Sequence, residues 1–432
     1  MVEQPPKKNT SSKTFGLKLK LEVEGVLTPI INDYLYWDKV KYKQASCTPQ
    51  QLWACVKLQR LSRGKTIAFG NYDFRFLVTD TMQRLLHGFD MHLGGNLSSN
   101  IGIAETDKNK FMLNSIMEEA ISSSQIEGAA TTRKKAKEMI RQEKKPRNKS
   151  DQMILNNFIT MKHISEHKQE KLTPEGILYV HKLMAAQTLD DKEDEGRFRD
   201  NDEVRVVNHS NSEVVYTPPV HTEIDGLIAD LCKFFNEDSD PFIHPIVKAC
   251  IIHFMIGWIH PFTDGNGRTA RALFYWYMLR NGYWLTEFMS ISRIIQDTKG
   301  QYERAYLYTE SDENDMGYFI HYHLKTMEKA FIALKEYINK KQREVKQAAA
   351  FMKIPGVNDR MAQIIKLLSD DGDRAFSTKE IENMFAISNF TARTDLKTLA
   401  DLGFLEVIAV NKKKQQYIKS AQFDKLINKV KK

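Results

Sequence analysis

The stretch from His260 to Arg271, which reads HPFTDGNGRTAR, collects residue types suited to phosphate chemistry. Gly265 and Gly267 are small enough for backbone N–H groups to converge on an anion. A helix that begins at about Arg268 would point its positive N-terminal end at the same place. Arg268 and Arg271 are three residues apart and therefore share one helix face. Two guanidinium groups, a glycine-rich turn and a helix N-terminus together predict a polyphosphate site.

Two further side chains in this stretch would complete a catalytic set. Asp264 lies beside the predicted phosphate site, where its carboxylate is a natural ligand for Mg²⁺. His260 is the obvious base nearby, because a neutral imidazole can accept a proton near pH 7. Taken singly, these features have simpler interpretations, since a His before Pro usually ends a helix and a Gly-x-Gly is usually a turn. Their conjunction in one short stretch favours phosphate chemistry.

The element before this stretch decides where His260 lies. Residues Ile246–Ile259 are apolar on nearly every face, which predicts a buried central helix. Pro261 ends that helix directly after His260, so the imidazole is expected at the mouth of a loop.

The rest of residues 50–350 is mostly helical in pattern, with one exception. Hydrophobic spacing predicts helices over Asp80–Leu93, Lys108–Ile126, Ser150–Glu166 and Thr173–Thr188. The exception is a pair of β-branched runs, Val204–Val207 and Glu213–Tyr216, which predict a hairpin with a five-residue loop at 208–212.

The pattern changes beyond about residue 352. Three short helices are expected, the second opened by Ser377 and the third capped by Ser388, followed by strands at Phe404–Val410 and Gln415–Ile418. This order is typical of a small α+β winged-helix domain. The predicted organisation is an N-terminal helical region at 1–105, a core at 106–350 and a winged-helix domain with a basic tail at 352–432.

The formal charge of +8 is unevenly distributed. Residues 411–432 carry +7, which leaves +1 for residues 1–410, so a uniformly basic protein is excluded. In the predicted recognition helix, Arg393 and Lys397 are offset by Asp395 and Asp401. A neutral helix is a poor seeker of phosphate, so DNA binding by this domain competes with docking to a protein partner or to the core.

Cysteine usage and hydropathy bear on location. The four cysteines show no C-x-x-C spacing, which favours a reducing, cytoplasmic compartment. The longest uncharged stretch, Ala249–Thr263, is shorter than the roughly 20 apolar residues that span a bilayer. We therefore expect a soluble protein with no membrane partner.

The stretch from His260 to Arg271 resembles, without a gap, the signature H-P-F-x-D/E-G-N-G-R-x-x-R of the Fic family. The likeness extends to the Gly196–Arg199 segment, the hairpin after it and His244-Pro245, and covers about residues 80–325. The resemblance implies a mainly α fold, a Fic-type helical core with a β-hairpin flap. It also implies transfer of AMP from ATP to a protein hydroxyl, with release of pyrophosphate. The Doc branch, which phosphorylates, has Lys where this chain has Gly267.

The resemblance also implies a role for each matching residue. His260 would take the proton from the target Ser, Thr or Tyr hydroxyl. The other residues would bind ATP and its metal: Asp264 would hold Mg²⁺, Gly265, Asn266 and Gly267 would form the anion hole, and Arg268 and Arg271 would contact the β- and γ-phosphates. Tyr302 falls near a position that borders the adenine, although a core or surface tyrosine is an equal alternative.

A second motif is regulatory. Residues 123–128, SSQIEG, fit the family's inhibitory pattern S/T-x-x-x-E-G/N. Ser123 and Glu127 share a helix face, and the resemblance is to the class whose inhibitory helix, here about 108–128, precedes the catalytic motif. A carboxylate facing Arg271 would form a bidentate ion pair and occupy the guanidinium that the γ-phosphate needs.

Three functions remain open from the sequence. The first is autoinhibited AMP transfer to a protein target, possibly the chain itself. The second is removal of AMP from a modified protein by the same site, with Glu127 orienting a water molecule. The third is a DNA-binding regulator whose Fic core senses a nucleotide. The target and its modified residue are not identified, and a homodimer is an open possibility.

Overall fold

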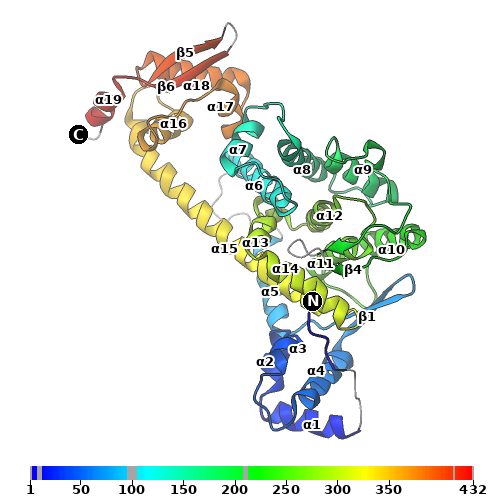
Figure 1. Cartoon of the computed structure of the whole chain (residues 1–432). Coiled ribbons are helices and arrows are strands. Elements are labelled where there is room, and N and C mark those ends of the chain that lie inside the picture. Colours follow the sequence, from blue (N-terminus) through cyan, green and yellow to red (C-terminus); the bar gives the residue numbers. More distant parts are fainter. Residues whose placement is uncertain (1, 7–11, 95–104, 208–212, 412–413, 431–432) are drawn as a thin grey trace. The chain divides into compact units, whose positions relative to one another are not determined.

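The chain divides into two compact units in a computed structural model that describes residues 2–6, 12–94, 105–207, 213–411 and 414–430 (Figure 1). Unit 1 contains residues 1–97, 118–130 and 148–330. Unit 2 contains residues 98–117, 131–147 and 331–432. These units cut across the predicted division at 105/106 and 350/352. The reason is that two helices, α6 (Glu105–Ile126) and α15 (Gly317–Ala348), run from one unit into the other.

Unit 1 begins with helices around a small hairpin. These elements are α1 (Ser12–Val23), α2 (Leu27–Asn32), α3 (Trp37–Val40), α4 (Pro49–Arg63), β1 (Lys65–Phe69), β2 (Tyr72–Phe76) and α5 (Asp80–Leu93). The β1–β2 hairpin was not predicted. Its sequence signal is the Gly70-Asn71 turn between two short runs with alternating burial, which the surrounding helical pattern obscured.

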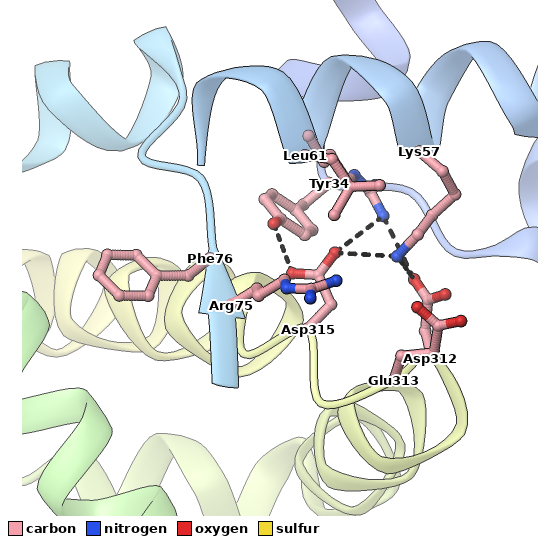
Figure 2. A pocket seen from close by; sticks show the side chains of 9 residues that line it. Tyr34, Lys57, Leu61, Arg75, Phe76, Asp312, Glu313 and Asp315 are labelled. Atoms are coloured by element: carbon pink, nitrogen blue, oxygen red, sulfur yellow. Dashed lines mark hydrogen bonds and ion pairs between the residues drawn. The ribbon is translucent and has the colours of Figure 1, made fainter. Parts of the chain in front are cut away.

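A buried ion cluster ties this N-terminal part to residues 312–315 within unit 1. Lys57 on α4 lies 2.8 Å from the Asp312 carboxylate and 3.6 Å from Asp315. Arg60 adds contacts of 3.9 and 3.7 Å to the same two carboxylates, and Tyr34 donates a hydrogen bond of 2.6 Å to Asp315 (Figure 2). Removal of one partner would leave an uncompensated buried charge, so the cluster fixes these segments as one body.

The rest of unit 1 is a helical core. Its elements are α8 (Lys149–Glu166), α9 (Pro174–Ala185), β3 (Val206–Val207), β4 (Val214–Tyr216), α10 (Ile224–Asn236), α11 (Pro245–Ile259), α12 (Asn266–Arg280), α13 (Ile291–Asp297) and α14 (Lys299–Ser311). Helices α11 and α12 lie against each other at the centre, with α8 and α9 against α12 and α10 against α11 (Figure 1). The predicted central helix is confirmed, since almost every residue of α11 is buried.

The hairpin of the flap is confirmed in its strands. β3 and β4 pair antiparallel, with Val206 opposite Tyr216, and the register shifts between Val206 and Val207. The predicted loop at 208–212 lies outside the described residues. The base of the hairpin is fixed to the core because the Tyr216 hydroxyl donates a hydrogen bond of 2.8 Å to the carbonyl of Trp258.

Unit 2 contains the C-terminal domain. Besides α7 (Arg133–Arg141), its elements are α16 (Asp359–Asp370), α17 (Thr378–Phe385), α18 (Asn389–Asp401), β5 (Leu405–Asn411), β6 (Lys414–Lys419) and α19 (Phe423–Val430). The three helices and the hairpin lie where the sequence predicted them. They surround an apolar core of their own that includes Ile365, Leu396 and Leu399. The helix α19 lies in the segment predicted to be a basic tail.

None of the described helices combines the length and the apolar character that crossing a membrane would require.

Candidate active site

His260 lies at the end of α11 in a left-handed backbone conformation. It is the C-cap residue, with φ of +50°, so the chain turns sharply into the loop that follows. The Nδ1 atom lies 3.2 Å from the Gly257 carbonyl oxygen. A carbonyl only accepts, so Nδ1 carries the proton and Nε2 is left with its lone pair. Burial lowers the pKa of His260. The ring is therefore neutral at pH 7 and able to accept a proton.

Arg199 holds the first half of the loop. Its Nε donates a hydrogen bond of 3.0 Å to the His260 carbonyl, and its backbone N–H donates one of 2.9 Å to the Pro261 carbonyl. The guanidinium also bonds to the Pro219 carbonyl and, at 3.0 Å, to the Asp202 carboxylate. One buried side chain thus joins His260 to both ends of the flap. The sequence motif pointed to this segment without revealing this role.

His181 holds the second half of the loop and was missed entirely. It lies on α9, fully buried, with Nε2 at 2.9 Å from the Asp264 carbonyl oxygen. The Gly196 N–H donates a hydrogen bond of 3.1 Å to Nδ1, which fixes the tautomer with the proton on Nε2. The ring stacks on Phe262 with centroids 3.7 Å apart. Burial lowers the pKa of His181 to about 4, so this ring stays neutral at physiological pH.

Asn266 closes the loop, because its side-chain amide forms hydrogen bonds within the loop. Asn266 accepts a hydrogen bond of 3.0 Å from the Phe262 N–H and donates one of 2.8 Å to the Phe262 carbonyl. The amide therefore acts inside the loop, and any contact of Asn266 with phosphate falls to its backbone N–H. Gly265 has φ of +86°, and a Cβ there would lie 3.1 Å from His181 Nε2, so the turn requires glycine.

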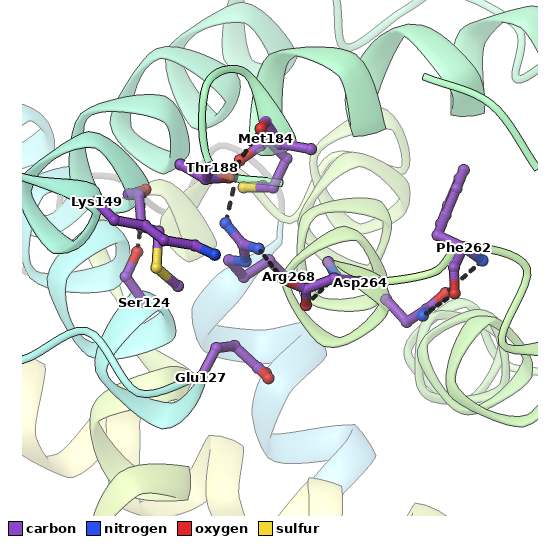
Figure 3. Close-up of polar contacts among 12 residues, drawn as sticks. Ser124, Glu127, Lys149, Met184, Thr188, Phe262, Asp264 and Arg268 are labelled. Carbon is purple, nitrogen blue, oxygen red and sulfur yellow. Dashed lines mark hydrogen bonds and ion pairs between the residues drawn. The ribbon is translucent and has the colours of Figure 1, made fainter. Parts of the chain in front are cut away.

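The two arginines of α12 are both buried and only partly satisfied. Arg268 donates a hydrogen bond of 3.1 Å to the Met184 carbonyl and lies 3.6 Å from Asp264 (Figure 3). Its Nε and Nη2 and the Nη1 of Arg271 are buried without a hydrogen-bond acceptor. Unpaired buried guanidinium donors at a helix N-terminus fit an anionic ligand such as phosphate.

The predicted inhibitory motif meets Arg271 in the structure, although through one carboxylate oxygen rather than the expected bidentate pair. Arg271 Nε donates a hydrogen bond of 2.8 Å to the Ser123 hydroxyl, and Nη2 lies 2.8 Å from the Glu127 carboxylate and 3.0 Å from the Ser123 carbonyl. Burial alone would raise the pKa of Glu127, but the charge of Arg271 lowers it overall. A Cβ at Gly267 would lie 2.3 Å from the Glu127 carboxylate oxygen, so this approach depends on glycine.

Glu119 fixes the same segment one helical turn before Ser123, and it was not predicted. Its buried carboxylate accepts hydrogen bonds of 2.9 Å from the hydroxyls of both Tyr275 and Ser290. Ser292 adds its N–H at 3.1 Å and its hydroxyl. Four donors from α12 and α13 thus hold α6 two turns before Glu127.

The exposure of the Asp264 carboxylate fits a metal ion that is also bound by the phosphates of a substrate. Its side chain is 55% exposed, and one oxygen accepts a hydrogen bond of 2.5 Å from the Gly265 N–H. No group of three or more His, Cys, Asp or Glu that could hold a metal occurs among the described residues. Mg²⁺ commonly uses one or two carboxylates with substrate phosphates, so a single carboxylate beside the arginines fits that ion.

Tyr302 lies at the edge of the same site. Its hydroxyl is 2.9 Å from His253 Nε2, and His253 Nδ1 is 2.8 Å from His323. The charge of Arg271 acts on the Tyr302 hydroxyl, although burial dominates and raises the pKa to about 12. The place of Tyr302 beside a nucleotide base stays a prediction.

The family comparison agrees with this geometry. The model described as Fic/DOC family matches residues 171–278, which include His181, Arg199 and the loop from His260 to Arg271. Residues 171–278 form a domain of the Fic/DOC family. A Fic family protein from Desulfovibrio desulfuricans G20 has the same fold, with a TM-score of 0.50 over 78% of this chain and 94% of that one, at 20% identity.

The relatives with names that state an activity match over short stretches. Protein adenylyltransferase fic-1 of Caenorhabditis briggsae is 40% identical over 68 residues, which is 16% of this chain and 13% of the relative. Protein adenylyltransferase Fic of Drosophila virilis is 32% identical over 132 residues, 30% of this chain and 25% of the relative. The matched stretches thus span a quarter or less of the relatives' own length.

His181 gives a first test of how the Fic loop is held. We expect His181→Phe to keep the stack on Phe262 but to lose both hydrogen bonds, which weakens binding of Mg²⁺–ATP by about tenfold. Calorimetric titration in a background of Glu127→Gly and His260→Ala measures this while the proposed base is absent. His163→Phe on α8 is the matched control, since that ring is half-buried beside His167, outside the loop contacts. Unchanged affinity in a folded His181→Phe variant would contradict a positioning role.

Proposed function

We propose that this chain is an autoinhibited protein adenylyltransferase, which moves AMP from ATP to a Ser, Thr or Tyr hydroxyl of a protein. The observation that carries the proposal is the arrangement at the start of α12. Unpaired guanidinium donors of Arg268 and Arg271 lie beside a histidine, His260, whose Nε2 is free to accept a proton. The family match and the names of the relatives support the same activity.

The proposed chemistry assigns each group one task. His260 Nε2 takes the proton of the target hydroxyl as that oxygen attacks the α-phosphorus. The bond from this phosphorus to the oxygen that bridges to the β-phosphate breaks, and pyrophosphate leaves with that electron pair. The N-terminal N–H groups of α12 and the two arginines stabilise the negative charge on the phosphates. Asp264 would hold Mg²⁺, which when bound neutralises part of the same charge.

The inhibition follows from the contacts of Arg271. Its Nε and Nη2 are occupied by Ser123 and Glu127, so the γ-phosphate of ATP would meet a guanidinium already paired with a carboxylate. The carboxylate would also repel that phosphate. Release of Glu127 from Arg271 is therefore the proposed step that activates the enzyme.

The protein target is expected to bind at the flap. A strand edge on the β3–β4 hairpin can pair with an extended segment of the target through main-chain hydrogen bonds. Such pairing aligns one hydroxyl with the α-phosphate without a specific side chain. A segment of another copy would satisfy the same pairing, which would be self-modification within a homodimer. Unpaired cysteines support a reducing, cytoplasmic location.

The decisive experiment uses ATP labelled separately at the α- and γ-phosphates. We expect protein to gain the α-label and not the γ-label, and the gain to be larger in Glu127→Gly than in the wild type. Transfer of the γ-label alone would mean a kinase.

Removal of AMP is the alternative chemistry at the same site. The Glu127 carboxylate is ionised at neutral pH, because Arg271 lowers its pKa, and its side chain is 30% exposed. An ionised, partly accessible carboxylate can orient a water molecule toward a phosphorus atom. Loss of α-label from a modified protein with wild type, together with no transfer by Glu127→Gly, would favour this reaction over the first.

DNA binding is a second candidate function. One contact favours it more than the charges counted along the predicted recognition helix did. Asp395 is buried and accepts hydrogen bonds of 2.7 and 3.1 Å from Arg360 and one of 2.9 Å from Asn358. It therefore does not offset Arg393 and Lys397, which are both exposed on α18, and the exposed Asp401 is left to oppose these two cations. The prediction of a neutral recognition helix counted a charge that is neutralised inside the domain. A winged helix would place this positive face in the major groove of DNA.

We expect duplex DNA to bind with an affinity that falls steeply with salt, as phosphate contacts require. Arg393→Ala should weaken binding and reduce the slope of log affinity against log salt by about one. Lys162→Ala on α8 is the matched control, because that lysine lies on the exposed surface of unit 1. Fluorescence anisotropy at several salt concentrations measures both quantities. Absent or salt-independent binding would refute this function.

A further inference from the structure

The inhibitory segment is flanked on both sides by residues of the other unit. Residues 118–130, which contain Ser123 and Glu127, belong to unit 1 with the Fic loop. The residues before and after them, 98–117 and 131–147, belong to unit 2 with the C-terminal domain. Helix α6 continues without a break from unit 2 into the inhibitory segment and ends at Ile126. Only residues 128–132 connect Glu127 to the start of α7.

Within unit 2, α7 is docked on α17 of the C-terminal domain. The Lys379 ammonium lies 2.9 Å from the Glu143 carboxylate, just after α7, and the Asn383 amide donates a hydrogen bond to the Arg141 carbonyl. Arg141 also donates a hydrogen bond of 2.9 Å to Asn114, in the first half of α6. The contact thus links the C-terminal domain to both flanks of the inhibitory segment.

Anchors on the two sides of Glu127 differ in kind. The residues before it are held inside unit 1 by Glu119 and by the Ser124 hydroxyl, which donates a hydrogen bond of 3.2 Å to the Met153 carbonyl. Helix α6 ends one residue before Glu127, and Gly128 follows with φ of +93°. Beyond it, the Ala130 N–H donates a hydrogen bond of 3.1 Å to Ser150, and the next ordered element is α7. A displacement of α7 therefore reaches Glu127 through five connecting residues and acts against the hydrogen bond of Ala130.

We propose that docking of α7 on α17 keeps Glu127 on Arg271, so that the C-terminal domain controls the inhibitory segment. The coupling rests on the proposed function for its effect on AMP transfer. The coupling does not depend on a contact between the two units, because the covalent chain connects α7 to Glu127. A displacement of α7 acts on the six residues that follow α6 and draws the carboxylate from the guanidinium. A ligand that alters the C-terminal domain would then change the fraction of uninhibited enzyme.

The test breaks the contact in the full-length chain without touching the Fic loop or the inhibitory residues. Lys379→Glu places a carboxylate against Glu143 and also against Glu382, which lies 3.1 Å from Lys379. We expect AMP transfer to rise about two- to fivefold, the range that loss of a partly exposed ion pair allows. Amide hydrogen exchange over residues 123–130 should become faster. The charge swap Lys379→Glu with Glu143→Lys should restore both values.

The matched control is Lys366→Glu on α16. This change makes the same reversal of charge and breaks an ion pair with Asp370 in the same domain, away from α7. It should leave transfer and exchange at the wild-type values. Wild-type transfer and exchange in Lys379→Glu, in a protein that Glu127→Gly does activate, would overturn the coupling. Failure of the charge swap to restore them would overturn it as well.

The exchange measurement separates this inference from the proposed function. Faster exchange at 123–130 in Lys379→Glu, reversed by the swap, would support the coupling even if no variant transferred AMP. That outcome would refute the adenylyltransferase and leave the link between the C-terminal domain and the inhibitory segment intact.

Discussion

Replacement of Glu127 by Gly is expected to raise the rate of AMP transfer by about 10- to 100-fold. The pair with Arg271 is a charge-assisted hydrogen bond of 2.8 Å at a buried guanidinium, and bonds of this kind contribute roughly 1.5–3 kcal/mol. Its loss leaves the Ser123 carbonyl as the acceptor on Nη2 and removes a negative charge from the site. The measurement is the initial rate of α-label incorporation at saturating ATP, in the wild type and the variant.

Two further variants divide this effect between charge and shape. Glu127→Gln keeps the length of the side chain but removes its charge, so it should give an intermediate rise. Ser123→Ala removes one neutral hydrogen bond to Arg271 Nε and should give a smaller one. Equal rates in wild type and Glu127→Gly would contradict autoinhibition by this carboxylate.

The sign of the pH effect on the inhibitory pair follows from the pKa of Glu127. Because its folded pKa is lowered, the pair is fully formed above the ordinary pKa of a glutamate and is lost only as pH falls through the lowered value. Changes of pH near neutrality should therefore leave the inhibition unaltered. The proposed activation then needs a step other than a change of pH, such as the proposed displacement of α7.

The parts of the site that could be predicted are the local ones. The residues from His260 to Arg271 are contiguous in the chain. Their order in the sequence was therefore enough to place them close together. The pairing of Glu127 with Arg271 spans 144 residues, and it was predicted only because the motif resembles that of a known family. Spacing alone gave a shared helix face for Ser123 and Glu127, not their partner.

The residues that hold the loop could not be found in the same way. His181 reaches Asp264 across 83 residues, and Glu119 reaches Tyr275 across 156. On its own helix each looks like a polar residue among apolar neighbours, and nothing in the local pattern says what it contacts. The charge of α18 was misjudged for a related reason, because Asp395 is neutralised by Arg360 from another helix. Counting charges along one helix cannot tell an exposed carboxylate from a buried, paired one.

Replacement of His260 by Ala, in a Glu127→Gly background, is expected to lower AMP transfer by about 10²- to 10⁴-fold. Positioned general bases contribute effects of this size. His260 is the one histidine in the sequence from 260 to 271. His181 cannot substitute, because both of its ring nitrogens are hydrogen-bonded. ATP binding, measured by calorimetry, should change little, since the arginines and the start of α12 are untouched. A fall in the rate with unchanged affinity marks a group that acts in the chemical step.

The pH dependence of transfer gives an independent test of the same base. Burial lowers the pKa of His260 below its usual 6.5, whereas the Glu127 charge raises it, so Glu127→Gly should lower it further. The rate should therefore be level near pH 7 and decline only as pH falls below about 6.5, where the imidazole becomes protonated. His167→Ala at the exposed end of α8 is the matched control and should keep both the rate and the profile. A decline that begins above pH 7, or a profile that persists in His260→Ala, would assign the proton transfer to another group.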